Sequence, residues 1–144
     1  RDSMAMKPFA GYNFADYFSH WLSFDKPGAN LPKIFHVNWF RKNSDGKFMW
    51  PGFGDNMRVL EWMLKRVTGQ AHATETPIGH LPLADDLNLE GLNIDAATLD
   101  QLLDVNREAW YEEMEAIGEY LQSYGDRTPK ALLAEQEKIA KQLA

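Results

Sequence analysis

The sequence predicts an α+β fold that is rich in helix and contains one β-hairpin. Residues 33–40 are mostly β-branched and aromatic, and turn-forming residues separate them from a second short run, which is the pattern of a hairpin. Apolar residues recur at helical spacing over 55–67 and again from residue 95 onward. At 144 residues the chain fits one domain, or one lobe of a larger one. We therefore treat 1–144 as one domain, with a hairpin segment at 33–56 and an acidic helical tail at 95–144.

The hairpin is expected to turn at Asn43-Ser44-Asp45-Gly46. In a three-residue loop, Gly46 is left-handed, Asn43 pairs with Lys47, and Lys42 pairs with Phe48. Glycine suits this form because it adopts a positive φ without steric strain. A four-residue loop would pair Lys42 with Lys47 instead. The sequence favours the three-residue loop.

The length of this loop decides which aromatic side chains share a face of the hairpin. The three-residue loop pairs Phe40 with Trp50, and it places Phe40, Phe48 and Trp50 on one face because strand side chains alternate. The four-residue loop would place Phe40 and Phe48 on opposite faces. Pro51 ends the return strand, which covers 47–50.

Helices are expected over most of the remaining chain. The predicted ranges are 16–22, 55–67, 95–103, 106–123 and a last helix after Thr128, with a loop-like stretch at 70–94. Asp55 or Asn56 is expected to cap the second helix, and Gly69 lies just past its end. Thr128 is expected to cap the last helix, with Pro129 at its first position.

Apolar stripes support two of these helices. In the second helix the stripe consists of Leu60, Met63, Leu64 and Val67. In the long helix at 106–123 it consists of Trp110, Met114, Ile117 and Leu121. Both sets recur at the three- and four-residue spacing of one helix face.

Composition excludes several classes of protein. The chain has 44% hydrophobic and 25% charged residues, as ordinary soluble proteins do. It has no apolar run long enough to span a membrane, and no signal peptide is evident. The absence of cysteine excludes disulfides and thiolate chemistry and is consistent with a reducing, cytoplasmic location. The four histidines are not spaced as zinc ligands, so no metal site is expected within the chain.

Charge is divided unevenly along the chain. Residues 1–70 contain ten Lys and Arg against six Asp and Glu, whereas residues 71–144 contain five against fifteen. The front half is too weakly basic to predict binding to extended nucleic acid. The start at Arg1, without an initiator methionine, suggests a fragment or a processed product.

A row of carboxylates in the acidic tail is a weak candidate for catalysis. Glu108, Glu112, Glu115 and Glu119 share one helix face. A carboxylate pair that performs acid–base chemistry needs one member in an apolar setting. This row lies roughly opposite the apolar stripe of the same helix, so we interpret it as a solvated face. The sequence also has no G-x-x-x-x-G-K-[ST] phosphate loop and no G-x-S-x-G nucleophile motif.

The aromatic residues near the hairpin are the stronger candidate for a binding site. Phe40 and Phe48 share a face in the favoured register, and Phe53 follows between two glycines at the start of a helix. Three rings, the amide of Asn56 and a helix N-terminus would suit a planar, hydrogen-bonding ring such as a nucleobase. The alternative is that these rings form the core of the hairpin. Pattern alone favours the core, and both interpretations stay open at this point.

The sequence resembles the C-terminal region of the GTP-dependent phosphoenolpyruvate carboxykinases of the bacterial type. The matching motifs are MAMKPF at 4–9, GYNF at 11–14, HWLS at 20–23, LPKIFHVNWFRK at 31–42, GKFMWPGFGDN at 46–56, RVLEWM at 58–63, TPIG at 76–79 and LNLEGL at 87–92. The resemblance covers nearly the whole chain and weakens after about residue 94. It implies that the chain is part of the α/β carboxykinase fold, within the nucleotide-binding lobe. Three positions depart from the family pattern, with Lys7 for Arg, Asp55 for Glu and Ser3 for Pro.

The resemblance implies a guanine pocket within residues 33–56. Its three phenylalanines fall on Phe40, Phe48 and Phe53, and the segment that contacts the base falls on Phe53, Gly54, Asp55 and Asn56. Trp39 adjoins the pocket as a possible wall.

Members of the family convert oxaloacetate and GTP to phosphoenolpyruvate, CO₂ and GDP in gluconeogenesis, with Mn²⁺ and Mg²⁺. The resemblance places the phosphate loop, the metal ligands, the oxaloacetate-binding arginines and the mobile lid upstream of Arg1. No catalytic residue is therefore expected in this chain. The implied partners are a guanine nucleotide and the N-terminal part of the same enzyme, which is expected to be a monomer, with no membrane or nucleic acid. The rivals are a non-catalytic nucleotide- or single-strand-binding module and a purely structural lobe.

Overall fold

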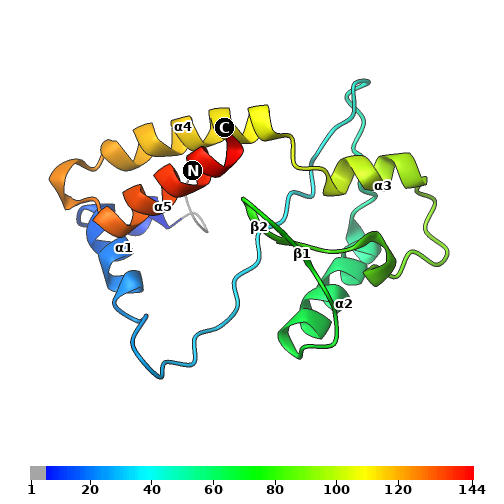
Figure 1. Cartoon of the computed structure of the whole chain (residues 1–144), viewed down its shortest axis with the longest axis horizontal. Helices are drawn as coiled ribbons and strands as arrows, with labels where there is room; N and C mark the ends of the chain where they lie inside the picture. The colour runs from blue at the N-terminus through cyan, green and yellow to red at the C-terminus, as the bar shows by residue number, and fades with distance from the viewer. Residues whose placement is uncertain (1–5) are drawn as a thin grey trace. The chain divides into compact units, whose positions relative to one another are not determined.

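The computed structural model describes residues 6–144, and the chain divides into two units that we describe separately (Figure 1). One unit is Lys33–Val105, and the other combines the chain up to Pro32 with Asn106–Ala144. Ser3 and the first two residues of the MAMKPF motif lie outside the described residues.

The unit of residues 33–105 is built around α2 and α3. Its elements are η3 (Phe53–Asp55), α2 (Asn56–Val67), β1 (Thr74–Thr76), β2 (Gly79–Leu81), η4 (Ala84–Asp86) and α3 (Ala96–Leu103). Its buried core consists of Trp62, Ala71, Leu87 and Leu99. Phe35 packs edge-on against Trp62, with their ring centroids 6.1 Å apart. This packing anchors α2 and therefore the residues at its N-terminus.

The strand predicted at 33–40 is wrong, and so is a regular return strand at 47–50. In the described chain, one isolated antiparallel bridge, between Lys42 and Phe48, is all the pairing formed in this segment, which Figure 1 draws as a loop. Strand preference depends on packing and on a neighbouring strand. Because Ile34 and Val37 are exposed, nothing within the chain rewards extension of the bridge into a ladder.

The regular hairpin lies instead within the stretch 70–94, which the sequence predicted to be loop-like. β1 and β2 are antiparallel and pair in the register Thr74 with Leu81 and Thr76 with Gly79. Pro77 and Ile78 form the connecting turn, which the Thr76 hydroxyl tightens by donating to the Gly79 carbonyl at 2.6 Å. The α+β class is confirmed, but its hairpin lies elsewhere.

α2 covers almost the predicted range, but its N-terminus is formed in a different way. It begins at Asn56 directly after the 3₁₀ turn, with Asp55 at the N-cap position as one of the two predicted residues, but the Asp55 side chain makes no capping hydrogen bond. The backbone of the 3₁₀ turn already leads into the helix. Gly69, with a φ of 75°, lies just past the C-terminus as predicted.

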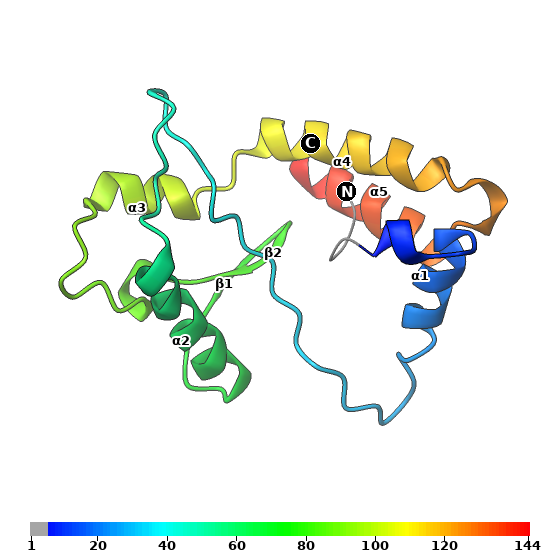
Figure 2. The same ribbon diagram turned by 180° about the vertical axis from the view of Figure 1, so that it is seen from behind.

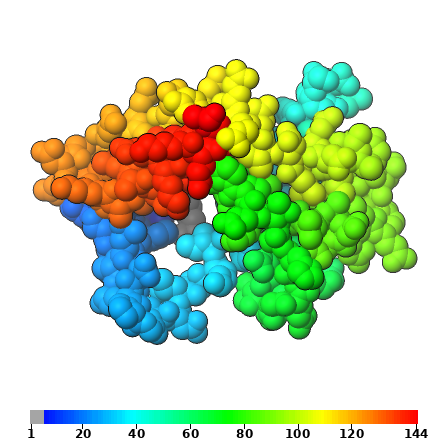
Figure 3. Space-filling view, viewed as in Figure 1, coloured from blue at the N-terminus to red at the C-terminus, as the bar shows by residue number. Residues whose placement is uncertain are grey.

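The second unit is helical. Its elements are η2 (Lys7–Phe9), α1 (Phe14–Leu22), α4 (Arg107–Gln122), η5 (Gly125–Arg127) and α5 (Lys130–Leu143). α4 and α5 lie side by side in both ribbon views and form a continuous surface in Figure 3 (Figures 1 to 3). Met114 and Leu121 are buried and Trp110 and Ile117 are half-buried, as the predicted stripe of α4 requires, and Leu143 of α5 is buried as well.

The outward face of α4 is acidic. Glu108, Glu112, Glu115 and Glu119 are all exposed, which agrees with their interpretation as a solvated face. α1 packs at the end of the α4/α5 pair, where Arg127 forms an ion pair with Asp16 at 2.8 Å (Figure 2).

Two further helix starts differ in detail. The prediction that Thr128 caps α5 is wrong, because its buried hydroxyl donates to the Leu121 carbonyl at 2.6 Å and α5 begins at Lys130. Asp95 caps α3 by accepting from the Thr98 amide at 2.7 Å. Hydrogen bonds from the Thr98 side chain and backbone lower the pKa of Asp95.

In the part of the chain described, no helix is long and apolar enough to cross a membrane.

Candidate functional site

The candidate site begins with the turn at residues 43–47. Asn43 holds it, because its backbone N–H donates to the Lys47 carbonyl at 2.9 Å and its side-chain oxygen accepts from the Asp45 and Lys47 amides at 3.0 Å. Gly46 has a φ of 75°, a conformation that glycine adopts without strain. Lys42 is bridged to Phe48. The three-residue loop is therefore confirmed.

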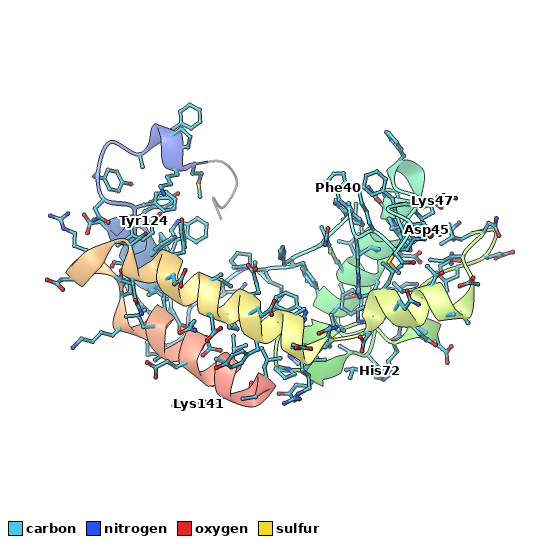
Figure 4. All side chains as sticks on the ribbon, turned by 90° about the horizontal axis from the view of Figure 1, so that it is seen from above. Phe40, Asp45, Lys47, His72, Tyr124 and Lys141 are labelled. Atoms are coloured by element: carbon cyan, nitrogen blue, oxygen red, sulfur yellow. The ribbon has the colours of Figure 1, made fainter. Side chains whose placement is uncertain are left out.

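Phe40 and Phe48 lie together as the three-residue loop predicts. Their ring centroids are 6.0 Å apart in an edge-on arrangement, and the rings are 71% and 59% exposed. The ammonium group of Lys42 lies 5.1 Å from the centroid of the Phe48 ring, within range of a cation–π interaction. Phe40 is labelled in Figure 4 near the turn residues Asp45 and Lys47. These two rings do not form a core within this chain.

Trp50 departs from the prediction. The predicted pairing of Phe40 with Trp50 does not form, because the pairing ends at the hydrogen bond from the Met49 amide to the Arg41 carbonyl, at 2.9 Å. Trp50 is only 7% exposed, and its indole N–H donates to the side-chain oxygen of Asn56 at 2.9 Å. This contact ties the turn segment to the first residue of α2.

Phe53 is the most exposed aromatic residue of the site. Phe53 is 96% exposed. Its φ is 48°, and among the described residues it is the one non-glycine residue with a positive φ. A left-handed conformation brings Cβ close to the following carbonyl oxygen and costs about 1–2 kcal/mol. Strain of this kind is typical of functional sites. Within residues 6–144 no ring contact joins Phe53 to Phe40 or Phe48, so the three rings do not close a slot.

The remaining predicted site residues surround the start of α2. Asp55 forms an ion pair with Arg58 at 2.9 Å, and Arg58 also donates to the Asn88 carbonyl at 2.7 Å. A Cβ at Gly54 would meet nothing within 4 Å, so the backbone there is open to a ligand. Trp39 is half-buried in the same unit.

Two side-chain contacts in the candidate site of residues 39–56 were not predicted from the sequence. One is the cation–π contact of Lys42, and the other is the hydrogen bond between Trp50 and Asn56. Trp50 and Asn56 are six residues apart along an irregular segment that contains Pro51 and Gly52, so no strand or helix period signals the second contact. The side chains that could bind a ligand are aromatic and amide groups. Among the described residues no group of three or more His, Cys, Asp or Glu could hold a metal ion.

The candidate site thus combines exposed aromatic rings, an open backbone at Gly54 and the start of a helix. Residues 1–142 match the family described as the phosphoenolpyruvate carboxykinase C-terminal P-loop domain. The chain belongs to this family.

Curated relatives carry the same family name. The chain is 50% identical over 144 residues to phosphoenolpyruvate carboxykinase (GTP) of Chlamydia pneumoniae. It is 50% identical over 145 residues to that of Neocallimastix frontalis and 47% identical over 143 residues to that of Thermoplasma volcanium. Each match covers 99% of this chain and 24% of the relative. The chain spans about a quarter of the length of these relatives.

The strain at Phe53 predicts the effect of two substitutions. Phe53→Gly should raise the free energy of unfolding by about 0.5–1 kcal/mol, because glycine tolerates the positive φ and the exposed ring contributes no packing. Phe53→Ala keeps a Cβ in the strained position and should give no such gain. Urea unfolding of the two variants measures the difference, and equal stability of the two would contradict strain at this residue.

Proposed function

We propose that this chain is the guanine-binding part of a GTP-dependent phosphoenolpyruvate carboxykinase. This enzyme converts oxaloacetate and GTP to phosphoenolpyruvate, CO₂ and GDP in gluconeogenesis, in the cytoplasm. The observation that carries the proposal is the exposed pair Phe40 and Phe48, in a segment that the Trp50–Asn56 hydrogen bond ties to the start of α2 and in a chain whose relatives are named for GTP. Under this proposal, Phe40, Phe48 and Phe53 contact the base, Trp39 adjoins the pocket, and Gly54, Asp55 and Asn56 line its polar edge.

Each group of the site has a distinct task in this proposal. Exposed rings offer flat apolar faces, and stacking of a base on an aromatic ring contributes about 1–3 kcal/mol. The edge-on pair is already formed, so the base needs to order little of the protein when it binds. The ion pair of Asp55 with Arg58 fixes the first turn of α2, where Asn56 presents its amide. The open backbone at Gly54 lets the base come close.

The contribution of this chain to catalysis is positioning. Phosphoryl transfer depends mainly on the placement of the phosphates and on stabilisation of their charge. Holding the base at one end fixes where the other end of the nucleotide lies. Mn²⁺ and Mg²⁺ would supply charge stabilisation at the phosphates, and we assign their ligands to the part of the enzyme outside this chain.

The partner that we propose for this chain is the remaining part of the same monomeric enzyme. Met57, Leu60, Leu64 and Val67 follow one face of α2, and all four are exposed. Of the predicted apolar stripe of α2, Met63 packs against the core around Trp62, whereas Leu60, Leu64 and Val67 are exposed. A helix that is apolar on two faces is typical of a buried helix. The relatives are about four times as long as this chain, which provides the polypeptide to cover it.

The proposed partner predicts a context-dependent effect at Leu64. Leu64→Ser should leave the stability of the 144-residue chain nearly unchanged, since Leu64 is 70% exposed. In the full-length enzyme the same change should cost about 2–3 kcal/mol, because the side chain would be buried there. Urea unfolding of both proteins measures this. An unchanged full-length enzyme would show that another surface, or none, meets the rest of the polypeptide.

The guanine pocket predicts selective loss of nucleotide binding. Phe40→Ala and Phe48→Ala should each weaken GDP binding by the full-length enzyme about tenfold, since each removes a stacking surface. Both variants should fold, because the rings are exposed. Phe9→Ala, which removes a still more exposed ring from the other unit, is the matched control and should bind GDP normally.

Tryptophan fluorescence titrated with GDP and with ADP measures these affinities. Equal responses to the two nucleotides in the parent protein would exclude a guanine pocket. Salt-dependent binding of single-stranded oligonucleotides through the same rings would instead support the nucleic-acid-binding module. Unfolding of both Phe variants would support a purely structural lobe.

The 144-residue chain alone should have no carboxykinase activity. The proposal assigns base recognition to this chain and the phosphate loop and metal ligands to the rest of the enzyme. An assay of phosphoenolpyruvate formation from oxaloacetate and GTP, with the full-length enzyme as positive control, measures this. Turnover by the chain alone would refute the division of roles.

A further inference from the structure

We propose that Trp50 is a positioning residue that sets the orientation of the Asn56 amide and, through it, the preference for guanine over adenine. This inference rests on the guanine pocket proposed above. It concerns a residue that the family resemblance does not place in the pocket. The contact that carries it is the 2.9 Å hydrogen bond between Trp50 Nε1 and Asn56 Oδ1.

The chemistry of the indole fixes which end of the amide faces Trp50. Indole Nε1–H is a donor only, whereas the Asn amide has an acceptor oxygen and a donor nitrogen. Rotating the Asn56 amide by half a turn would place two donors against each other. Trp50 is 7% exposed, so its N–H has little access to water as an alternative partner. The Asn56 oxygen therefore has to face Trp50.

The amide nitrogen of Asn56 is consequently the group left for a ligand. Among the described residues, Asn56 Nδ2 makes no hydrogen bond. It is also not among the buried side-chain atoms that lack a partner, which in the described residues means Trp62 Nε1 alone, so Asn56 Nδ2 is not buried. Asn56 Nδ2 is thus an accessible donor at the first residue of α2. Its neighbours on the chain are Gly54, with its open backbone, and the exposed ring of Phe53.

A fixed donor at this place distinguishes the two purines. Guanine presents the acceptors O6 and N7 on one edge, whereas adenine presents an amino donor at position 6. The Asn56 NH₂ group can donate to O6 of guanine, but it would meet another donor on adenine. Without the Trp50 N–H, the amide can turn and offer its oxygen to the adenine amino group. Selectivity would then fall even though every residue in contact with the base is unchanged.

The substitution Trp50→Phe in the full-length enzyme tests this inference. It removes the N–H and keeps an aromatic ring in the buried position. GDP and IDP, which share the O6 acceptor, should bind about tenfold more weakly, and ADP should bind as before or better. Isothermal titration with the three nucleotides measures the ratios. Trp110→Phe, the same change at a half-buried tryptophan of the other unit, is the control and should leave all three affinities unchanged.

A second variant covers the case in which Trp50→Phe does not fold. Asn56→Asp keeps an oxygen acceptor for Trp50 and replaces the outward donor with an acceptor. It should shift the preference from GDP towards ADP, and Asn56 is only partly buried, so folding should be retained.

The outcomes separate this inference from the proposed pocket. A parent enzyme without preference for GDP over ADP overturns both. A selective parent together with an equal loss of GDP and ADP binding in Trp50→Phe shows that Trp50 acts through packing alone. An unchanged GDP to ADP ratio in Trp50→Phe, or a retained GDP preference in Asn56→Asp, also overturns the inference.

Discussion

The turn closed by Asn43 is the interaction on which the candidate site depends. Asn43 binds the Asp45 and Lys47 amides with its side chain and the Lys47 carbonyl with its backbone, and this closes a loop of three residues. A loop one residue longer would reverse the direction of every side chain beyond it. The contact between Phe40 and Phe48, and the position of Lys42 over the Phe48 ring, follow from this register. A single bridge suffices to fix them because the turn, rather than a long ladder, sets the alignment.

The sequence predicts local features of this chain better than features that depend on distant partners. The left-handed Gly46, the α4 stripe through Met114 and Leu121, and the extent of α2 each follow from a few neighbouring residues, and each is confirmed. The strand at 33–40 is wrong because β-branched residues need a neighbouring strand that this chain does not supply. The burial of Trp50 could not be predicted from alternation, since the ladder that would define its face ends at Met49. Aromatic content therefore pointed to a candidate site, while the turn and the helix start decided which rings are exposed.

Exposed apolar side chains fall into two geometric groups in this chain. The four residues along α2 form a stripe with helical spacing, as expected of a surface that packs against other polypeptide. Phe40, Phe48 and Phe53 follow no such period, and they lie at a turn and at a helix start where backbone groups are open. Packing surfaces are expected to be broad and regular, whereas a ligand site is small and combines rings with directed polar groups. The structure thus allows the two kinds of exposed surface to be separated by their geometry.

The backbone at Phe53 strengthens the distinction between packing and binding. A core residue gains from burial, and this gain can offset a strained φ, but the ring of Phe53 is 96% exposed and gains almost nothing within this chain. Glycine at this position would relieve the strain, as it does at the preceding Gly52, whose φ is 80°. A phenylalanine held in a left-handed conformation is thus unfavourable for the stability of this unit taken alone. Its presence is understandable if the ring serves a contact outside the unit, and the adjoining donor at Asn56 and open backbone at Gly54 make a bound base the contact that fits.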